Sequence, residues 1–338
     1  MFELAESESI DVKIKVIGGG GENAVNSMIA AGLSGIDFIA IDTNIRKLEN
    51  SAATTKVQIG TTLTRGLGAG AKPVIGQQAA IEGSDFIREC LKNADMVFIT
   101  AGMGGGTGAG AAPVVAGIAK EMGILTIAVV TKPFYYEGRT RALNAEAGIK
   151  ELKKNVDAYI VIPNDKIHLS VPKGTSLIKS FDIANDILRQ AIQSITDLLL
   201  IRGHINHDFA DIKAIMEKAG RSVMGIGYGK AEEGGAIAAV KQAIANPLLE
   251  DSSIEGARGI LLNITGGADM PLHAVQDAAS VVNDLADDNA NIILGIVINP
   301  SMKDNITVTI IATGFDEKVE ALSLAGVSKW TPNRLQYK

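Results

Sequence analysis

The sequence predicts an α/β protein composed of a Rossmann-like domain with a parallel sheet, a long central helix, and a second, smaller α/β domain. Short apolar runs alternate with helical stretches over the first half of the chain, which is typical of parallel strands connected by helices. One helical stretch, residues 176–201, is much longer than the others and separates the two halves. The length of 338 residues is sufficient for about two domains.

Six apolar runs of the first half have the length and the boundaries of buried strands. They are residues 12–17, 38–41, 56–60, 96–100, 124–131 and 158–162. In the second half we expect strands at residues 223–229, 259–265, 292–298 and 306–312, and helices at residues 231–245 and 271–287. From residue 223 onward there is no glycine-rich cradle or catalytic cluster, so we expect this part to act as a scaffold.

A run of glycines follows the fourth predicted strand. Residues 101–110 read Ala-Gly-Met-Gly-Gly-Gly-Thr-Gly-Ala-Gly, and residues 111–122 have a helical pattern. Glycine permits positive φ angles and places no Cβ in the path of a ligand. The free amides at the start of a helix favour an anion. The pattern therefore predicts a phosphate-binding turn, but not a Walker loop, because no Gly-Lys-Ser/Thr follows.

Two further glycine-rich stretches have a similar setting. Gly19, Gly20 and Gly21 follow the first predicted strand and lead through Asn23 into a helix, so we expect a second loop that faces phosphate. Residues 66–71 form a third stretch, which on its own is equally typical of a flexible turn.

The composition excludes several classes of function. A net charge of -6 gives no basis for a nucleic-acid partner. No apolar run reaches the roughly 20 residues that span a bilayer, so we expect no direct membrane insertion. The acidic start lacks the pattern of a signal peptide. The single cysteine, Cys90, fits a reducing compartment, and we expect a cytoplasmic protein.

The glycine run also carries a resemblance to a known family. Gly-Gly-Gly-Thr-Gly-x-Gly at residues 104–110 resembles the signature of the tubulin and FtsZ superfamily of GTPases. The flanking Thr-Ala-Gly-Met and Ala-Ala-Pro are similar to those of the cell-division family FtsZ. This resemblance covers about residues 12–314 and implies the tubulin/FtsZ fold. It also implies a GTP-binding domain at 1–175, a connecting helix at 176–203, a C-terminal domain at 204–315 and a tail at 316–338.

The same resemblance implies an activity and its partners. A protein of this family binds GTP or GDP, with Mg²⁺ expected beside the nucleotide, and polymerises head to tail into the filaments of the division ring at mid-cell. Other cell-division proteins are then further partners. The tail at 316–338 does not match the family's membrane-tether peptide, and no side chain is assigned as a metal ligand.

The resemblance also assigns roles to individual residues. It places the phosphates on the two glycine loops, the second of which ends at Asn23. It places the ribose at Glu137 and nucleotide oxygens at Arg141, and it leaves Asn164, Phe181 and Asn185 for the base. The nucleotide-binding set is Gly19, Gly20, Gly21, Asn23, Gly105, Gly106, Thr107, Gly108, Glu137, Arg141, Asn164, Phe181 and Asn185. Residues 42–44 read Asp-Thr-Asn where the family shows Asn-Thr-Asp, so no roles are carried over to them.

The residue types are chemically suited to these roles, although local alternatives exist. An asparagine amide carries both a donor and an acceptor, which a guanine edge requires, and an arginine fork meets pairs of oxygens. Glu137 and Arg141 are equally placed to form an ordinary i,i+4 helix pair. Phe181 could stack on the base or belong to the apolar stripe of the central helix.

A second specific motif follows the central helix. Residues 206–211 read Asn-His-Asp-Phe-Ala-Asp and resemble the family's synergy loop, which implies that Asn206, Asp208 and Asp211 position water on the nucleotide of the next subunit. Locally, Asp208 also suits a helix N-cap and Asp211 a first turn. His207 stands where the family has an apolar residue, so we expect it to tune the pH response or to weaken assembly.

Two alternatives stay open at this stage. A nicotinamide-dependent oxidoreductase is disfavoured because no acidic residue lies about 20 residues beyond a Gly-x-Gly-x-x-Gly motif. An FtsZ-like paralogue that binds GTP or co-assembles, with little turnover, is favoured by a short first glycine loop, by His207, by the tail, and by Ala109 in place of the usual Thr or Ser.

Overall fold

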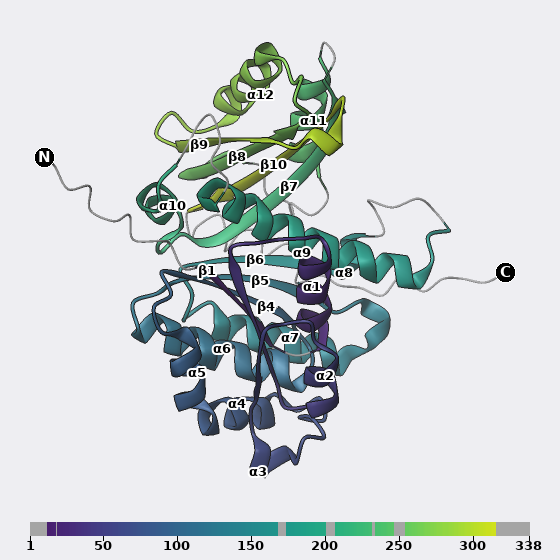
Figure 1. The fold of residues 1–338 in the computed structure, drawn as a ribbon, viewed down its shortest axis with the longest axis vertical. Helices are drawn as coiled ribbons and strands as arrows, with labels where there is room; N and C mark the ends of the chain where they lie inside the picture. Colours follow the sequence, from purple (N-terminus) through teal and green to yellow (C-terminus); the bar gives the residue numbers. More distant parts are fainter. Residues whose placement is uncertain are drawn as a thin grey trace, which may run out of the picture.

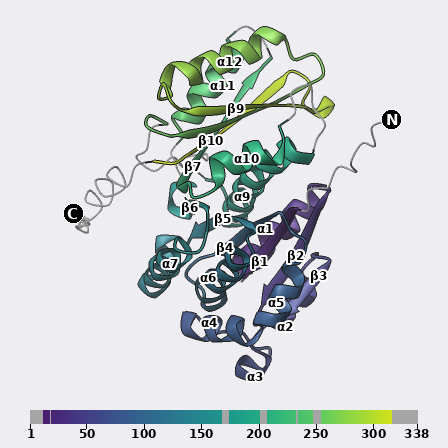
Figure 2. The same ribbon diagram turned by 90° about the vertical axis from the view of Figure 1, so that its left-hand side faces the viewer.

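The computed structural model describes residues 12–17, 19–167, 174–200, 207–231, 234–246 and 254–315. Ten strands form one sheet in the order β3-β2-β1-β4-β5-β6-β7-β10-β8-β9. The strands are β1 Val12–Ile17, β2 Ile36–Asp42, β3 Thr55–Gln58, β4 Met96–Gly102, β5 Leu125–Lys132, β6 Ala158–Pro163, β7 Gly220–Lys230, β8 Gly259–Gly266, β9 Asn291–Ile298 and β10 Asn305–Thr313. Each strand expected from the sequence is present (Figures 1 and 2).

The first six strands are all parallel. β1 lies between β2 and β4, and its last residue, Ile17, is in register with Ile41 of β2 and Ala101 of β4. β5 and β6 continue the sheet beyond β4 in the same direction. The carboxyl ends of these strands therefore lie along one edge, which is where ligands bind in open α/β sheets.

The strands of the second half continue the same sheet and include both parallel and antiparallel neighbours. β7 joins β6 through three parallel residue pairs, from Ala158↔Gly220 to Ile160↔Ser222. β10 is antiparallel to both β7 and β8, whereas β9 is parallel to β8. Helices α11 (Gly235–Ile244) and α12 (Leu272–Leu285) pack on these strands and form one buried apolar cluster with β7, β8 and β10.

The helices of the first half cover both faces of its sheet. One face carries α4 (Pro73–Glu82), α5 (Ser84–Leu91), α6 (Gly106–Glu121) and α7 (Arg139–Leu152), and the other carries α1 (Gly19–Ala30) and α9 (Leu177–Leu200). α9 crosses between the two halves, and its buried residues share one cluster with strands of both (Figures 1 and 2). Shorter elements complete the fold: α2 Ile45–Asn50, α3 Thr61–Thr64, α8 Asn164–Ile167, α10 Phe209–Met216, and the 3-10 turns at Tyr135–Glu137 and Pro300–Met302.

Two helices begin earlier than the sequence pattern indicates. α6 begins at Gly106 rather than near residue 111, and α1 begins at Gly19. Residues 19–21 and 106–110 are therefore first turns of helices rather than extended loops, whereas residues 66–71 form the loop between α3 and α4. α4 was not expected from the sequence, whereas α5 is the helix on which Cys90 was expected to pack. No helix in the described part of the chain has the length and apolar character needed to cross a bilayer.

Candidate functional site

A cleft of about 670 Å³ lies at the carboxyl edge of the parallel strands. This volume is within the usual range for small-molecule sites. Residues that follow β2, β4, β5 and β6 line the cleft, together with α1, α9 and the loop after α3. The described lining is Asn23, Asn26, Asp42, Asn44, Lys47, Asn50, Leu67, Gly68, Ala69, Gly70, Ala71, Gly102, Met103, Gly105, Gly106, Thr107, Gly108, Thr131, Pro133, Glu137, Arg141, Asn164, Phe181, Ala184 and Asn185.

The glycine run divides into two structural roles. Gly105 is the N-cap of α6, and residues 105–108 line the cleft with the first amides of that helix. Gly110 is required by packing instead, because a Cβ there would lie 2.0 Å from the carbonyl oxygen of Pro73 on α4. A Cβ at Gly76 would lie 2.2 Å from the carbonyl oxygen of Gly106. The number of glycines therefore reflects close helix packing as well as an open cradle.

The departure at Ala109 has a packing explanation. Ala109 is 3% exposed and is absent from the described lining of the cleft. It lies against Gly148 of α7, where an added Cβ would come within 2.9 Å of the Ala109 side chain. A small residue at this position fits the α6–α7 contact, so Ala109 gives little information about nucleotide turnover.

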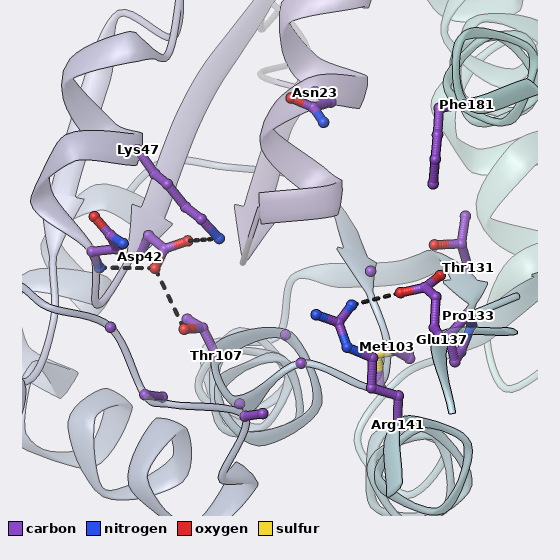
Figure 3. Close-up of a pocket in the computed structure, with 18 of the residues that line it drawn as sticks. Asn23, Asp42, Lys47, Met103, Thr107, Thr131, Pro133, Glu137, Arg141 and Phe181 are labelled. Atoms are coloured by element: carbon purple, nitrogen blue, oxygen red, sulfur yellow. Dashed lines mark hydrogen bonds and ion pairs between the residues drawn. The ribbon is translucent and has the colours of Figure 1, made fainter. Parts of the chain in front are cut away.

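Polar residues that the sequence interpretation left without roles gather beside α6. The hydroxyl oxygens of Thr43 and Thr107 lie 2.8 Å apart, and Thr107 Oγ1 also lies 3.4 Å from Asp42 Oδ1. The Lys47 ammonium lies 3.9 Å from Asp42 Oδ2 (Figure 3). Because Asp42 ends a parallel strand, its place at the ligand-binding edge follows from the sheet alone.

The opposite end of the cleft contains the residues expected to bind sugar and base (Figure 3). Glu137 Oε2 accepts a hydrogen bond of 2.5 Å from Arg141 Nη1, so the two expected ligands are also an i,i+4 pair. Phe181 is 40% exposed and lies edge-on to Phe134 at 5.3 Å between ring centroids. The apolar residues in the middle of α9 are buried, whereas Phe181 near its start is partly exposed and lines the cleft.

Asn164 has an unusual position for a polar side chain. It is 7% exposed at the start of α8, it lines the cleft, and its Oδ1 accepts no hydrogen bond from the described residues. An unpaired buried carbonyl is costly, and a ligand donor would satisfy it. Asn185 lines the same end of the cleft from α9.

The first glycine stretch is placed in α1. Gly19, Gly20 and Gly21 form its first turn immediately after the end of β1. The described lining from this helix consists of Asn23 and Asn26, and Asn26 was not expected. Contact of the three glycines with a phosphate stays a prediction.

The acidic motif is separate from the cleft. Asp208 is the N-cap of α10, where its Oδ1 accepts from the amide of Asp211, and Asp211 Oδ2 lies 3.3 Å from the amide of Asp208. The capping role expected from the sequence is thus present. The motif follows the far end of α9, whose 24 residues extend about 36 Å. Asn206 lies outside the described residues.

His207 connects the acidic motif to the second half of the sheet. Its Nε2 lies 2.7 Å from the carbonyl oxygen of Leu294 in β9, and its Nδ1 lies 3.7 Å from Asp211 Oδ2. A carbonyl oxygen accepts hydrogen bonds only, so Nε2 carries the proton in this contact. The imidazole is 17% exposed and so fills a largely buried position.

The fold and the cleft define a class of protein: an α/β protein with an anion cradle at the carboxyl edge of a parallel sheet and polar groups for a larger ligand beyond it. Comparison with known families makes this specific. The family model described as "Tubulin/FtsZ family, GTPase domain" matches residues 11–172, and "FtsZ family, C-terminal domain" matches residues 220–316. The chain belongs to the tubulin/FtsZ family of GTPases, as the resemblance in the glycine run indicated.

Solved structures of this family are similar over nearly the whole chain. An empty FtsZ dimer from M. jannaschii is 40% identical with a TM-score of 0.86, covering 90% of this chain and 88% of that chain. A point mutant of FtsZ from the same organism is 39% identical with a TM-score of 0.86, covering 91% and 92%. CetZ2 from Haloferax volcanii, solved as a GTPγS-bound protofilament, is 20% identical with a TM-score of 0.76, covering 94% and 98%, and shows the fold alone.

Proposed function

We propose that this protein binds and hydrolyses GTP and polymerises head to tail, and that its GTPase site is completed between successive subunits. The observation that carries this proposal is the separation of the two predicted parts of the site. The cleft lies at one end of α9, and the acidic motif follows the other end. One subunit does not bring the two together, whereas stacking in one direction would.

The positions of the helix starts and of the amide side chains orient the nucleotide along the cleft. Its phosphates lie on the amides of Gly105, Gly106, Thr107 and Gly108 and near the turn of Gly19 to Gly21, where two helix N-termini favour an anion. Glu137 and Arg141 bind the sugar and its adjoining oxygens. The base lies between Asn164, Asn185 and Phe181, where the unpaired Oδ1 of Asn164 accepts from the guanine edge.

Mg²⁺ fits this arrangement as an ion that arrives with the nucleotide. Within the described residues there is no group of three or more His, Cys, Asp or Glu side chains that could hold a metal. The two carboxylates in the described lining, Asp42 and Glu137, each face a cation. Mg²⁺ typically keeps several waters and binds substrate phosphates, so it would supply charge neutralisation there without a dedicated protein cage.

The acidic motif provides the second half of the reaction centre. Hydrolysis of a phosphate anhydride depends mainly on placement of water and on charge stabilisation. Asp208 and Asp211 are exposed at the start of α10, where they are available to a neighbouring molecule. With Asn206 they would orient the attacking water. FtsZ from M. jannaschii has been solved as a dimer, which supports self-association of a related chain.

Asp211→Ala tests this division of labour. We expect the variant to bind GTP with the parent affinity and to lose at least about 100-fold in turnover, which is the usual scale for removing one positioning group. Equilibrium binding of GTP and release of phosphate are the measurements. Asp284→Ala removes an exposed acid from α12 and serves as the control.

Because Asp211 also caps α10, Asp211→Asn is a necessary companion variant. Its amide oxygen can still face the Asp208 amide, so the helix start is retained while the charge is lost. Hydrolysis at the parent rate by either variant would contradict a shared site. Loss of GTP binding in both would instead place Asp211 in nucleotide binding.

We place the protein in the cytoplasm at the division site, in the division ring and with other cell-division proteins as partners, by extension from its family. A second candidate is a paralogue that binds GTP and co-assembles with little turnover. The observation that favours it is His207, whose ring lies against the carboxylate of Asp211. Phosphate release by filaments of the pure protein separates the two candidates.

A further inference from the structure

The phosphate end of the cleft contains a buried carboxylate. Asp42 is 1% exposed, lines the cleft, and lies beside the start of α6. Its Oδ1 accepts the amide of Asn44 at 2.9 Å and lies 3.4 Å from the hydroxyls of Thr43 and Thr107. Its Oδ2 accepts no hydrogen bond from any described residue. The Asp42 carboxylate therefore lies where it would repel a bound polyphosphate.

Lys47 is positioned to compensate that charge. Its Nζ lies 3.9 Å from Asp42 Oδ2, and its side chain is 47% exposed. The separation exceeds a hydrogen bond, so no described residue occupies the three donors of this ammonium. Figure 3 shows Lys47 extending from α2 toward Asp42, with Thr107 below and with Glu137 and Phe181 on the far side of the cleft.

The local backbone fixes this orientation. Asp42 Oδ1 accepts from the amide of Asn44, and Asn44 Oδ1 in turn accepts from the amide of Arg46 at 3.0 Å as the N-cap of α2. These two turns hold the start of the helix against the end of β2. Leu48 is buried beneath the helix, so the preceding residue, Lys47, is directed over the cleft.

The two ion pairs of the described lining differ in tightness. Glu137 and Arg141 are in contact at 2.5 Å, whereas Asp42 and Lys47 are 3.9 Å apart. The charges in each pair cancel, so the described lining presents no excess of positive charge to a polyphosphate. A loosely held lysine next to the α6 cradle is the cation that can move toward the last phosphate at little cost.

We propose that Lys47 binds the terminal phosphate of a nucleoside triphosphate and that Asp42 holds its ammonium within reach, so that the pair favours triphosphate over diphosphate. The proposal rests on the nucleotide site proposed above and adds a specificity determinant to it. Without Lys47, the carboxylate of Asp42 faces the terminal phosphate uncompensated. The cost of losing Lys47 therefore includes a repulsion that removal of the Asp42 charge relieves.

Binding of GTPγS and of GDP to the full chain tests the proposal by calorimetry. We expect Lys47→Gln to weaken GTPγS binding about tenfold, the scale of one hydrogen bond between charged groups. GDP lacks the terminal phosphate, so its binding should weaken less than threefold, through a longer-range attraction that salt screens. Lys47→Arg keeps the charge and should bind GTPγS nearly as the parent does. Arg46→Gln removes one charge from the same helix at a position outside the described lining and should change neither affinity.

The double variant Asp42→Asn/Lys47→Gln separates charge from structure. The proposal expects it to bind GTPγS more tightly than Lys47→Gln alone, because the repulsion is gone. Equal loss for GTPγS and GDP in Lys47→Gln, or no recovery in the double variant, would overturn the proposal. So would unchanged binding by Lys47→Gln combined with loss of Mg²⁺-dependent binding in Asp42→Asn, which would make Asp42 a metal ligand. If the parent bound neither nucleotide, the proposed function itself would fail.

Discussion

At the scale of single residues, the cleft is defined by polar side chains whose needs the protein does not meet. Asn164 Oδ1 and Asp42 Oδ2 are buried without a hydrogen-bond donor among the described residues. In a stable protein such groups are rare, since each costs about 1–3 kcal/mol. Both face the same cleft. A ligand that brings a hydrogen-bond donor would satisfy Asn164 Oδ1, whereas the charge of Asp42 is compensated in the cleft by the Lys47 ammonium, 3.9 Å from its Oδ2.

Phe181 provides a prediction about the base end of the cleft. Phe181→Ala should weaken GTP binding by about 5- to 150-fold, because stacking on one base contributes about 1–3 kcal/mol. The unfolding midpoint should change little, because the ring is 40% exposed. Fluorescence titration with a labelled GTP measures the affinity.

Ile178→Ala is the matched control for this prediction. Ile178 is 76% exposed on the same helix and is absent from the described lining of this cleft. If Phe181→Ala bound GTP like the Ile178 variant, stacking on Phe181 would have to be abandoned.

The sequence indicated most candidate residues, because they follow strand ends that hydrophobic patterning identifies. It missed Asp42, Asn44, Lys47 and Asn26 as parts of the cleft. The order Asp-Thr-Asn differs from the family pattern, so resemblance gave no roles there. The position of Lys47 depends on how α2 begins, which two side-chain turns determine. Hydrophobic periodicity contains no information about such turns.

At the scale of elements, α9 links the two halves and the two parts of the proposed site. Its amino end carries Phe181 and Asn185, its middle is buried, and the acidic motif follows its carboxyl end. Near that carboxyl end, Leu198 packs tightly on β9, since a Cβ at Gly295 would lie 1.8 Å from Leu198 Cδ2. A shift of α9 along its axis would therefore move both ends and disturb the second half of the sheet.

The glycine-rich helices show why sequence patterns misplace element boundaries. Glycine has low helix propensity, so residues 106–110 were expected to form a turn. In the structure these residues belong to α6, and the close approach of α4, which leaves no space for a Cβ at Gly110, requires glycine within the helix. Tertiary packing overrides propensity at such positions, and the packing partner is about 35 residues away in the sequence.

Asp197 provides a prediction about pH for α9. Burial raises the pKa of this half-buried carboxyl to about 6 from 3.8, against opposing effects of the Gln193 hydrogen bond and the Arg189 charge. The folded state therefore holds this proton more tightly than the unfolded state. Its contribution to stability is present below about pH 4 and is lost as the pH rises through about 6.

Asp197→Asn should remove this dependence. The variant should be more stable than the parent at pH 7 to 8, by on the order of 1–2 kcal/mol, and the advantage should shrink toward pH 5. Urea unfolding at several pH values measures the difference. Asp182→Asn, an exposed position on the same helix, should show no such trend. A constant difference between parent and Asp197→Asn at every pH would contradict the assignment.

At the scale of the whole molecule, the geometry separates the cleft from the acidic motif. A chain of this fold can hold a nucleotide in its own cleft, but its acidic motif lies beyond the far end of a helix of 24 residues. A contact between unlike faces repeats without closing and produces filaments. Hydrolysis would then depend on assembly, and the activity of each molecule would depend on its neighbours.

The rate of GTP hydrolysis per molecule, measured as protein concentration rises, tests this account most directly. Phosphate release and light scattering are followed in the same samples. The account predicts little turnover at low concentration and a steep rise in specific activity at the concentration where scattering begins. A specific activity that is constant and high below that concentration would show that one subunit contains the complete site, and would contradict the account.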